Sequence, residues 1–271
     1  MKRKPLLSKD TSNAKLAKTH DVHGQDWETL ILYMAPAEVV YSSLTEEESS
    51  LIVHGVRVSL CPASTEGCRR DCLFYQGRAR LFKEVNEARI RKARQFILEP
   101  LEFFAQLHSE VRRALAAATR KGKRLAVRLN GTTDIDWTPF VRLYPDVQFY
   151  DYTKTARGMA FARGALPENY HITFSRSEEN RNIASRVLRA GGNVAVVVDK
   201  GVNVDFTDPR LLDGDLHDAR FLDGRSDTGL VVVLRAKGSL KNKGTDTGFC
   251  LNQTGWDSFI GSIENSLKVS A

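Results

Sequence analysis

The chain has 271 residues, of which 42% are hydrophobic, so it can bury a sizeable core in one large domain or two small ones. It contains no run of about eighteen apolar residues, which excludes a membrane-spanning helix. Its formal net charge is +7, and residues 1–18 and 78–94 each sum to +5. The remainder therefore sums to −3, so the chain has a basic tail and a basic helix rather than a uniform charge.

Residues 1–26 are polar and lack hydrophobic periodicity, so we expect a basic flexible N-terminal segment there. This segment lacks the apolar stretch of a secretory signal, and we expect a reducing cytoplasm. Residues 27–271 are expected to form a single α/β domain. The basic tail and the helix over 78–94 are candidates for binding nucleic acid or a phosphorylated substrate. The alternative is that both are ordinary solvated segments.

The first predicted elements precede residue 122. A strand covers 30–34, and residues 51–60 lead into a loop that contains three cysteines. From residue 78 the apolar spacing is helical until Pro100, and a second helix covers 101–120 before Gly122.

Five more β-type runs follow, over 125–129, 147–150, 171–174, 194–198 and 230–234. Helical or loop segments separate them, and strands that alternate with helices predict a parallel sheet. We therefore expect an α/β fold, either a partial (β/α)6 barrel or an open parallel sheet with helices on the outer face.

Polar residues follow nearly every predicted strand. Since the carboxyl ends of parallel strands line the site in such folds, we expect a shared pocket that binds a cofactor or substrate. Its candidate residues are Asn130, Asp134, Asp151, Lys154, Ser175, Arg176, Ser177, Asp199 and Lys237. Three cations among them, Lys154, Arg176 and Lys237, would form an anion-binding rim. The alternative is that they pair with Asp151, Glu178 and Asp199.

An acid-rich segment lies between the last two of these strands. It contains Asp213, Asp215, His217, Asp218 and Asp223. The glycines at 214 and 224 favour a surface loop, and a hard-metal site is the alternative.

Three of the four cysteines lie within twelve residues, as Cys61, Cys68 and Cys72. Three thiolates on one short loop can hold one metal centre and leave a coordination position open, and soft thiolates suit an iron–sulfur cluster or zinc. Cys250 or His54 would supply a fourth ligand, and a buried apolar thiol is the alternative for Cys250. A disulfide and ordinary thiols are the remaining interpretations of the three.

The order of these parts resembles the radical S-adenosylmethionine enzymes, in which a three-cysteine loop after the first barrel strand holds a [4Fe-4S] cluster. The resemblance implies that Cys61, Cys68 and Cys72 bind such a cluster. Its open iron would face the polar strand ends and take S-adenosylmethionine or another small-molecule ligand. The turn at residues 130–134 lies where that family holds the cofactor's amino group. The spacing here is Cys-x6-Cys-x3-Cys rather than Cys-x3-Cys-x2-Cys, which favours cluster binding over cleavage of the cofactor.

A closer resemblance covers residues from about 35 to 249. The motifs that carry it are Cys61–Cys72, Val127–Trp137, Phe149–Lys154, Thr173–Glu178, Asp213–Asp215 and Leu234–Gly238. They are similar to a bacteriophage family called gene product 88-like, which implies a viral protein in the host cytoplasm but brings no function. The leading hypothesis is an iron–sulfur protein, with radical chemistry as an enzymatic extension. The alternative is a zinc- or cluster-stapled protein that binds nucleic acid or a host protein without catalysis.

Overall fold

The computed structural model describes residues 4–9, 26–50, 52, 57–75, 82–224, 227–237 and 246–268. These residues group into two compact units. The first comprises Met1–Pro62 and Leu73–Phe149, and the second comprises Ala63–Cys72 and Tyr150–Ala271. A single domain over 27–271 stays a prediction.

Among the described residues, the first unit contains four neighbouring strands. They are β1 (Leu7–Lys9), β2 (Trp27–Leu32), β3 (Arg124–Arg128) and the first residues of β4 (Val147–Thr153). Strands β2, β3 and β4 are parallel, and β1 is antiparallel to β2.

Strand β1 falls within the segment that the sequence predicts to be flexible. The carboxylate of Glu110 accepts hydrogen bonds from the backbone N–H groups of Leu6 and Leu7 at 3.0 and 2.8 Å, and both leucines are buried. These bonds and this burial hold residues 4–9 on the first unit. Residues 1–3 and 10–25 of the segment lie outside the described residues.

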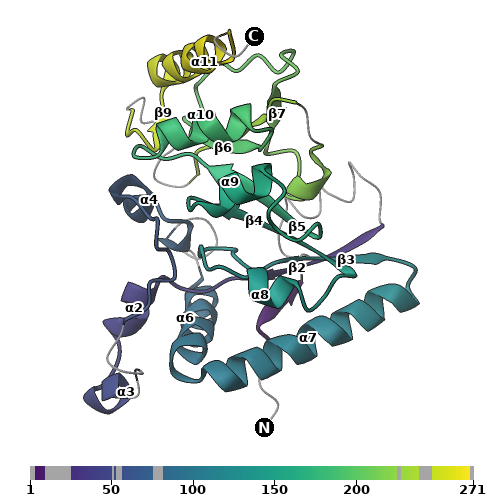
Figure 1. Cartoon of the computed structure of the whole chain (residues 1–271). Helices are drawn as coiled ribbons and strands as arrows, with labels where there is room; N and C mark the ends of the chain where they lie inside the picture. Colours follow the sequence, from purple (N-terminus) through teal and green to yellow (C-terminus); the bar gives the residue numbers. More distant parts are fainter. Residues whose placement is uncertain are drawn as a thin grey trace. The chain divides into compact units, whose positions relative to one another are not determined.

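The helices of the first unit are α2 (Ala37–Tyr41), α3 (Glu46–Ser50), η3 (Leu73–Tyr75), α6 (Lys83–Leu98), α7 (Pro100–Arg120) and α8 (Thr138–Val141). Helix α7 begins at Pro100, because proline fits the first turn of a helix but not its interior. Helices α6 and α7 pack on each other, and α7 lies along β3 (Figure 1). The two helices predicted here are confirmed, although residues 78–81 lie outside the described residues.

The second unit contains the rest of β4, then β5 (Tyr170–Ser175), β6 (Val194–Val198), β7 (Leu211–Asp213), β8 (Val231–Arg235) and β9 (Cys250–Leu251). Their order is β4-β5-β6-β8-β7, with β9 beside β6. Its helices are α4 (Glu66–Arg70), α9 (Arg157–Ala162), α10 (Arg181–Arg189), η4 (Arg220–Leu222) and α11 (Gln253–Lys268).

The two faces of the sheet in the second unit differ. One face packs Phe174, Val194 and Val231 against the apolar sides of α10 and α11. Because successive strand residues point to opposite faces, Thr173 and Leu234 belong to the other face. The segment after β7 covers that face so closely that a Cβ on Gly214 would lie 2.6 Å from the Leu234 side chain.

The α/β class is confirmed, and of the two predicted architectures the open, mostly parallel sheet is the one observed. The described strands do not close into a barrel. None of the helices in the described ranges is long and apolar enough to cross a membrane.

Candidate functional site

The three clustered cysteines are all partly exposed, whereas Cys250 is buried. Cys61 belongs to the first unit, and Cys68 and Cys72 belong to the second. Among the residues that the structure describes, no three His, Cys, Asp or Glu side chains are grouped closely enough to hold a metal ion. The metal centre therefore stays a prediction, carried by the type, spacing and exposure of its three cysteines.

Cys61 lies against the turn that follows β3. Its Sγ is 3.7 Å from the carbonyl oxygen of Thr132, and the N–H of Asp134 donates to the carbonyl of Leu60 at 2.7 Å. The first cysteine and the turn at 130–134, which the sequence assigns to one site, are thus neighbours within the first unit.

Asn130 organises this turn from a position that is 2% exposed. Its Oδ1 accepts hydrogen bonds from Thr133 Oγ1 at 2.8 Å, from Ile135 N at 2.9 Å and from Trp137 Nε1 at 3.1 Å. Its Nδ2 donates to the carbonyl of Ile135 at 2.9 Å. These bonds define a structural function for Asn130, and ligand binding by Asn130 and Asp134 stays a prediction.

Helix α4, which carries Cys68, is held within the second unit by Glu178. Oε1 of Glu178 accepts a hydrogen bond from the N–H of Gly67 at 2.7 Å, and the hydroxyl of Thr65 caps the helix by accepting from the N–H of Cys68 at 3.3 Å. Burial raises the pKa of Glu178, but its hydrogen bonds outweigh burial and the net shift is downward.

Gly67 is required at this contact between α4 and Glu178. A Cβ at residue 67 would lie 2.8 Å from Oε1 of Glu178 and 2.9 Å from the Cβ of Phe249. The glycine therefore allows α4 to approach the end of β5 and the residue before β9.

Cys250 lies in β9 and is 2% exposed. Burial, with smaller effects from Asp199 and Asp71, raises the pKa of its thiol to about 12. Cys250 is therefore a neutral thiol at neutral pH, as the apolar-thiol interpretation expects. His54, the other candidate for a fourth ligand, lies outside the described residues.

Two of the three predicted rim cations lie at the same turn in the second unit. The Nζ of Lys154 is 5.5 Å from the centre of the Phe249 ring, and Nη1 of Arg176 donates to the carbonyl of Gly248. Lys237 instead forms an ion pair of 3.7 Å with Asp215, which is not one of the three carboxylates that the ion-pairing alternative names.

The remaining strand-end candidates lie within local hydrogen-bond networks. Asp151 is 1% exposed and accepts a hydrogen bond from the hydroxyl of Tyr170 at 2.9 Å. Asn180 binds the backbone on both sides of Arg176, by accepting from Ser177 N at 2.7 Å and donating to Ser175 O at 3.0 Å. Asp199 accepts from the N–H of Lys200.

The acid-rich segment after β7 is not the surface loop that its glycines suggest. Arg220 is 1% exposed, and its Nη1 lies 3.3 Å from Oδ2 of Asp223. The ring of His217 contacts both partners, with Nε2 3.5 Å from Asp223 and Nδ1 3.1 Å from Arg220. Phe221 of the same segment packs on Tyr150, with ring centres 5.2 Å apart.

The basic residues of α6 are bound within the first unit. Arg89 lies over the ring of Tyr33, Arg91 donates to the carbonyl of Pro5, Lys92 donates to the hydroxyl of Ser8 and Arg94 pairs with Glu48. These four cations belong to the segment 78–94 that the sequence predicts to bind nucleic acid, and here they contact other parts of the first unit. Arg78 and Arg80 of the same segment lie outside the described residues.

A second basic surface, the α7–β3 surface, is absent from the sequence-based candidates. It comprises Arg112, Arg113, Arg120, Lys121, Lys123 and Arg124, and no Asp or Glu occurs between residues 111 and 133. All six are at least partly exposed. Two are paired locally, since Lys121 lies 2.6 Å from Glu28 and Arg124 lies over the Trp27 ring. The sequence signal that could have identified this surface is the absence of Asp and Glu from residues 111–133.

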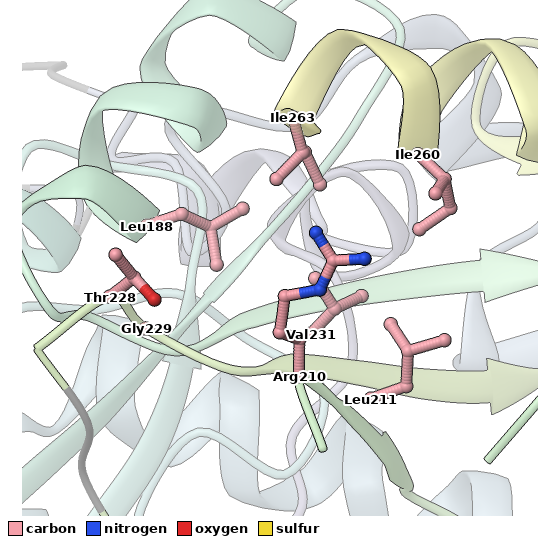
Figure 2. A pocket seen from close by; sticks show the side chains of 8 residues that line it. All are labelled: Leu188, Arg210, Leu211, Thr228, Gly229, Val231, Ile260 and Ile263. Carbon is pink, nitrogen blue, oxygen red and sulfur yellow. The ribbon is translucent and has the colours of Figure 1, made fainter. Parts of the chain in front are cut away.

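A cavity in the second unit is too small for a ligand. It has a volume of about 10 Å³, room for about one water molecule. Figure 2 shows its lining, which is Leu188, Arg210, Leu211, Thr228, Gly229, Val231, Ile260 and Ile263. The guanidinium of Arg210 is paired with Asp208 at 2.6 Å and Glu264 at 3.1 Å.

A surface groove of about 330 Å³ in the first unit lies next to the cysteine loop. It is lined by Glu38, Tyr41, Ser42, Arg57, Val58 and Ser59. The N–H of Cys61 donates to Oγ of Ser59 at 3.1 Å, so one wall of the groove leads directly into the first cysteine.

A family described as Gene product 88 matches residues 5–253, a range that includes all the motifs and all the candidate site residues named above. Comparison with curated proteins and with solved structures gives no match. The chain belongs to the phage Gene product 88 family.

Proposed function

We propose that the protein binds a [4Fe-4S] cluster through Cys61, Cys68 and Cys72 in the host cytoplasm. The observation that carries this proposal is the presence of three partly exposed cysteines on one twelve-residue stretch. Thiolates are the usual ligands of iron–sulfur clusters, and three of them leave one iron open. Partial exposure lets the thiols reach a metal that is delivered from solution.

The residues around the cysteines have positioning functions under this proposal. Glu178 and Thr65 hold the helix that carries Cys68, and Thr132 lies beside Cys61. A bound cluster would supply one-electron chemistry and an open iron for a small ligand such as S-adenosylmethionine. The protein would be a radical enzyme only if that ligand is S-adenosylmethionine.

Metal analysis of anaerobically purified protein tests the proposal. We expect about four irons and four sulfides per chain, with a broad absorption band near roughly 400 nm. Replacement of Cys61, Cys68 or Cys72 by serine should remove the iron. Cys250→Ser is the matched control and should retain it. A spectral change on addition of S-adenosylmethionine would show an open iron.

Two results would contradict the cluster. Stoichiometric zinc without iron would indicate a structural zinc site, since zinc also accepts thiolate ligands. Protein that contains neither metal after anaerobic purification, with Cys250→Ser behaving like the three other variants, would exclude a metal centre at the cysteine loop.

A second candidate function is nucleic-acid binding without catalysis, and the α7–β3 surface favours it. Its exposed arginines lie in a stretch with no acidic residue, and such a surface attracts phosphate backbones. Binding that weakens steeply with salt would support this function, and no binding at low salt would exclude it.

A further inference from the structure

Three cationic side chains of the second unit gather around one turn before β9. Lys154 follows β4 and lies over the ring of Phe249, and Arg176 follows β5 and donates to the carbonyl of Gly248. Arg181 begins α10, and its Nη2 is 3.8 Å from the position that a Cβ on Gly248 would occupy. Three side chains from different parts of the second unit therefore place positive charge near Gly248 and Phe249.

Arg176 is incompletely bound by the protein at this turn. Its side chain is among the largest that are fully buried, with the residue 2% exposed, and its Nε has no hydrogen-bond partner among the described residues. A buried charge is normally paired with a carboxylate, because removal from water is costly. Its guanidinium carbon lies 5.7 Å from the centre of the Phe259 ring, and among the described residues Arg176 forms no ion pair with a carboxylate.

The two acidic residues near Arg176 have other partners. Glu178 accepts a hydrogen bond from the N–H of Gly67 at 2.7 Å, and Asp246 accepts one from the N–H of Gly248 at 2.6 Å. They attract Arg176 only at longer range. Burial, reinforced by the positive charge of Arg181, lowers the pKa of Arg176 to about 10.

We propose that Lys154, Arg176 and Arg181 form a binding site for a small anion with a carboxylate or phosphate group. Guanidinium groups match the geometry of both anions and can bind them through two parallel hydrogen bonds. The Phe249 ring would cover one side of the ligand, since it already lies beneath Lys154. The site uses no cysteine and is independent of the proposed cluster, although Phe249 also borders the helix that carries Cys68.

Calorimetric titration of the full-length protein with inorganic phosphate tests this site, at constant ionic strength maintained with sodium chloride. We expect saturable binding, which Arg181→Ala and Lys154→Gln should each weaken by about tenfold, because each removes one charged contact. Arg189→Ala is the matched control, since Arg189 is an exposed arginine at the other end of α10. It should leave the affinity within about twofold of the wild type.

The same titration has results that would overturn the proposal. These are the absence of saturable phosphate binding, or equal weakening by Arg181→Ala and Arg189→Ala. Competition by acetate would indicate a carboxylate ligand, and phosphate binding without such competition would indicate a phosphate ester. Arg181→Ala changes an exposed side chain, so its circular dichroism spectrum should match that of the wild type and separate lost binding from lost folding.

Discussion

Lys92 is a buried cation whose charge opposes folding of the first unit. It is 4% exposed and donates to Ser8 Oγ at 3.3 Å, and burial, followed by repulsion from Arg91, lowers its pKa from 10.5 to about 8. The unfolded chain therefore binds more protons than the folded chain between about pH 8 and pH 10.5. The free energy of unfolding should rise with pH across that window.

We therefore expect Lys92→Met to stabilise the protein at pH 7. The substitution removes the free-energy cost of keeping a buried charge at residue 92, which is at most roughly 3 kcal/mol. The loss of the hydrogen bond to Ser8 offsets about 1 kcal/mol of this gain. Urea unfolding at pH 7 and pH 10 measures the effect, which should vanish at the higher pH. Lys83→Met is the control, because that side chain is 86% exposed. A gain that is equal at both pH values would exclude this explanation.

Single residues show how much of the site was predictable. The cysteine spacing and the cations after β4 and β5 are visible in the sequence because metal binding and charge depend on residue type. The functions of Asn130 and Glu178 are not visible in the same way. Each depends on hydrogen bonds to backbone groups, and for Glu178 the partner is 111 residues away in the chain.

At the scale of elements, Glu178 should control the docking of α4. Its carboxylate binds Gly67, and the loss of a charge-assisted hydrogen bond costs about 1.5–3 kcal/mol. Glu178→Ala should therefore increase the rate at which trypsin cleaves after Arg69 and Arg70 by roughly tenfold. The neighbouring Glu179 is exposed, so Glu179→Ala should leave the rate unchanged. Equal cleavage of the two variants would show that α4 docks without Glu178.

The buried segment after β7 should make stability depend on pH. Burial, partly offset by Arg220, raises the pKa of Asp223 from 3.8 to about 6. The folded state then binds more protons than the unfolded state between about pH 4 and pH 6. The contribution of Asp223 to the free energy of unfolding is therefore larger below this window and falls as pH rises through it.

The variant Asp223→Asn should remove this dependence. Relative to the variant, the wild type should lose up to roughly 3 kcal/mol of unfolding free energy between pH 4 and pH 6, with little further change above about pH 7. Denaturant unfolding at three pH values measures the difference. Asp227→Asn is the control, because Asp227 is exposed. A relative stability that rises with pH would contradict the stated protonation of Asp223.

The elements also show where prediction from sequence fails. Alternation of apolar runs and helical spacing predicts the central strands and helices α6 and α7, since burial of one face controls those patterns. Strand β1 has only three residues and depends on Glu110 of α7 for its place, so its own sequence carries little signal. Asp223 resembles a turn residue in the sequence, and its ion pair with Arg220 offsets part of the cost of burying its side chain.

At the scale of the whole molecule, charge is divided unevenly. Residues of the first unit carry a formal charge of +6 and those of the second carry +1, which together give the total of +7. Four cations of α6 make contacts within the first unit, whereas the α7–β3 surface exposes part of that excess charge. The net charge predicts that the protein attracts polyanions, but it does not identify the surface that binds them.

The double substitution Arg112→Glu/Arg113→Glu should therefore weaken nucleic-acid binding. Each lost phosphate contact lowers the slope of log K against log salt by about 0.9 on duplex DNA, so we expect the slope to fall by about two. Fluorescence anisotropy with a labelled duplex between 50 and 200 mM salt, as a typical range for such titrations, measures it. Arg186→Glu/Arg189→Glu is the matched control, with two exposed arginines of α10 in the nearly neutral second unit. If the control lowers the slope equally, the attraction is a property of total charge, and the α7–β3 surface is not a specific interface.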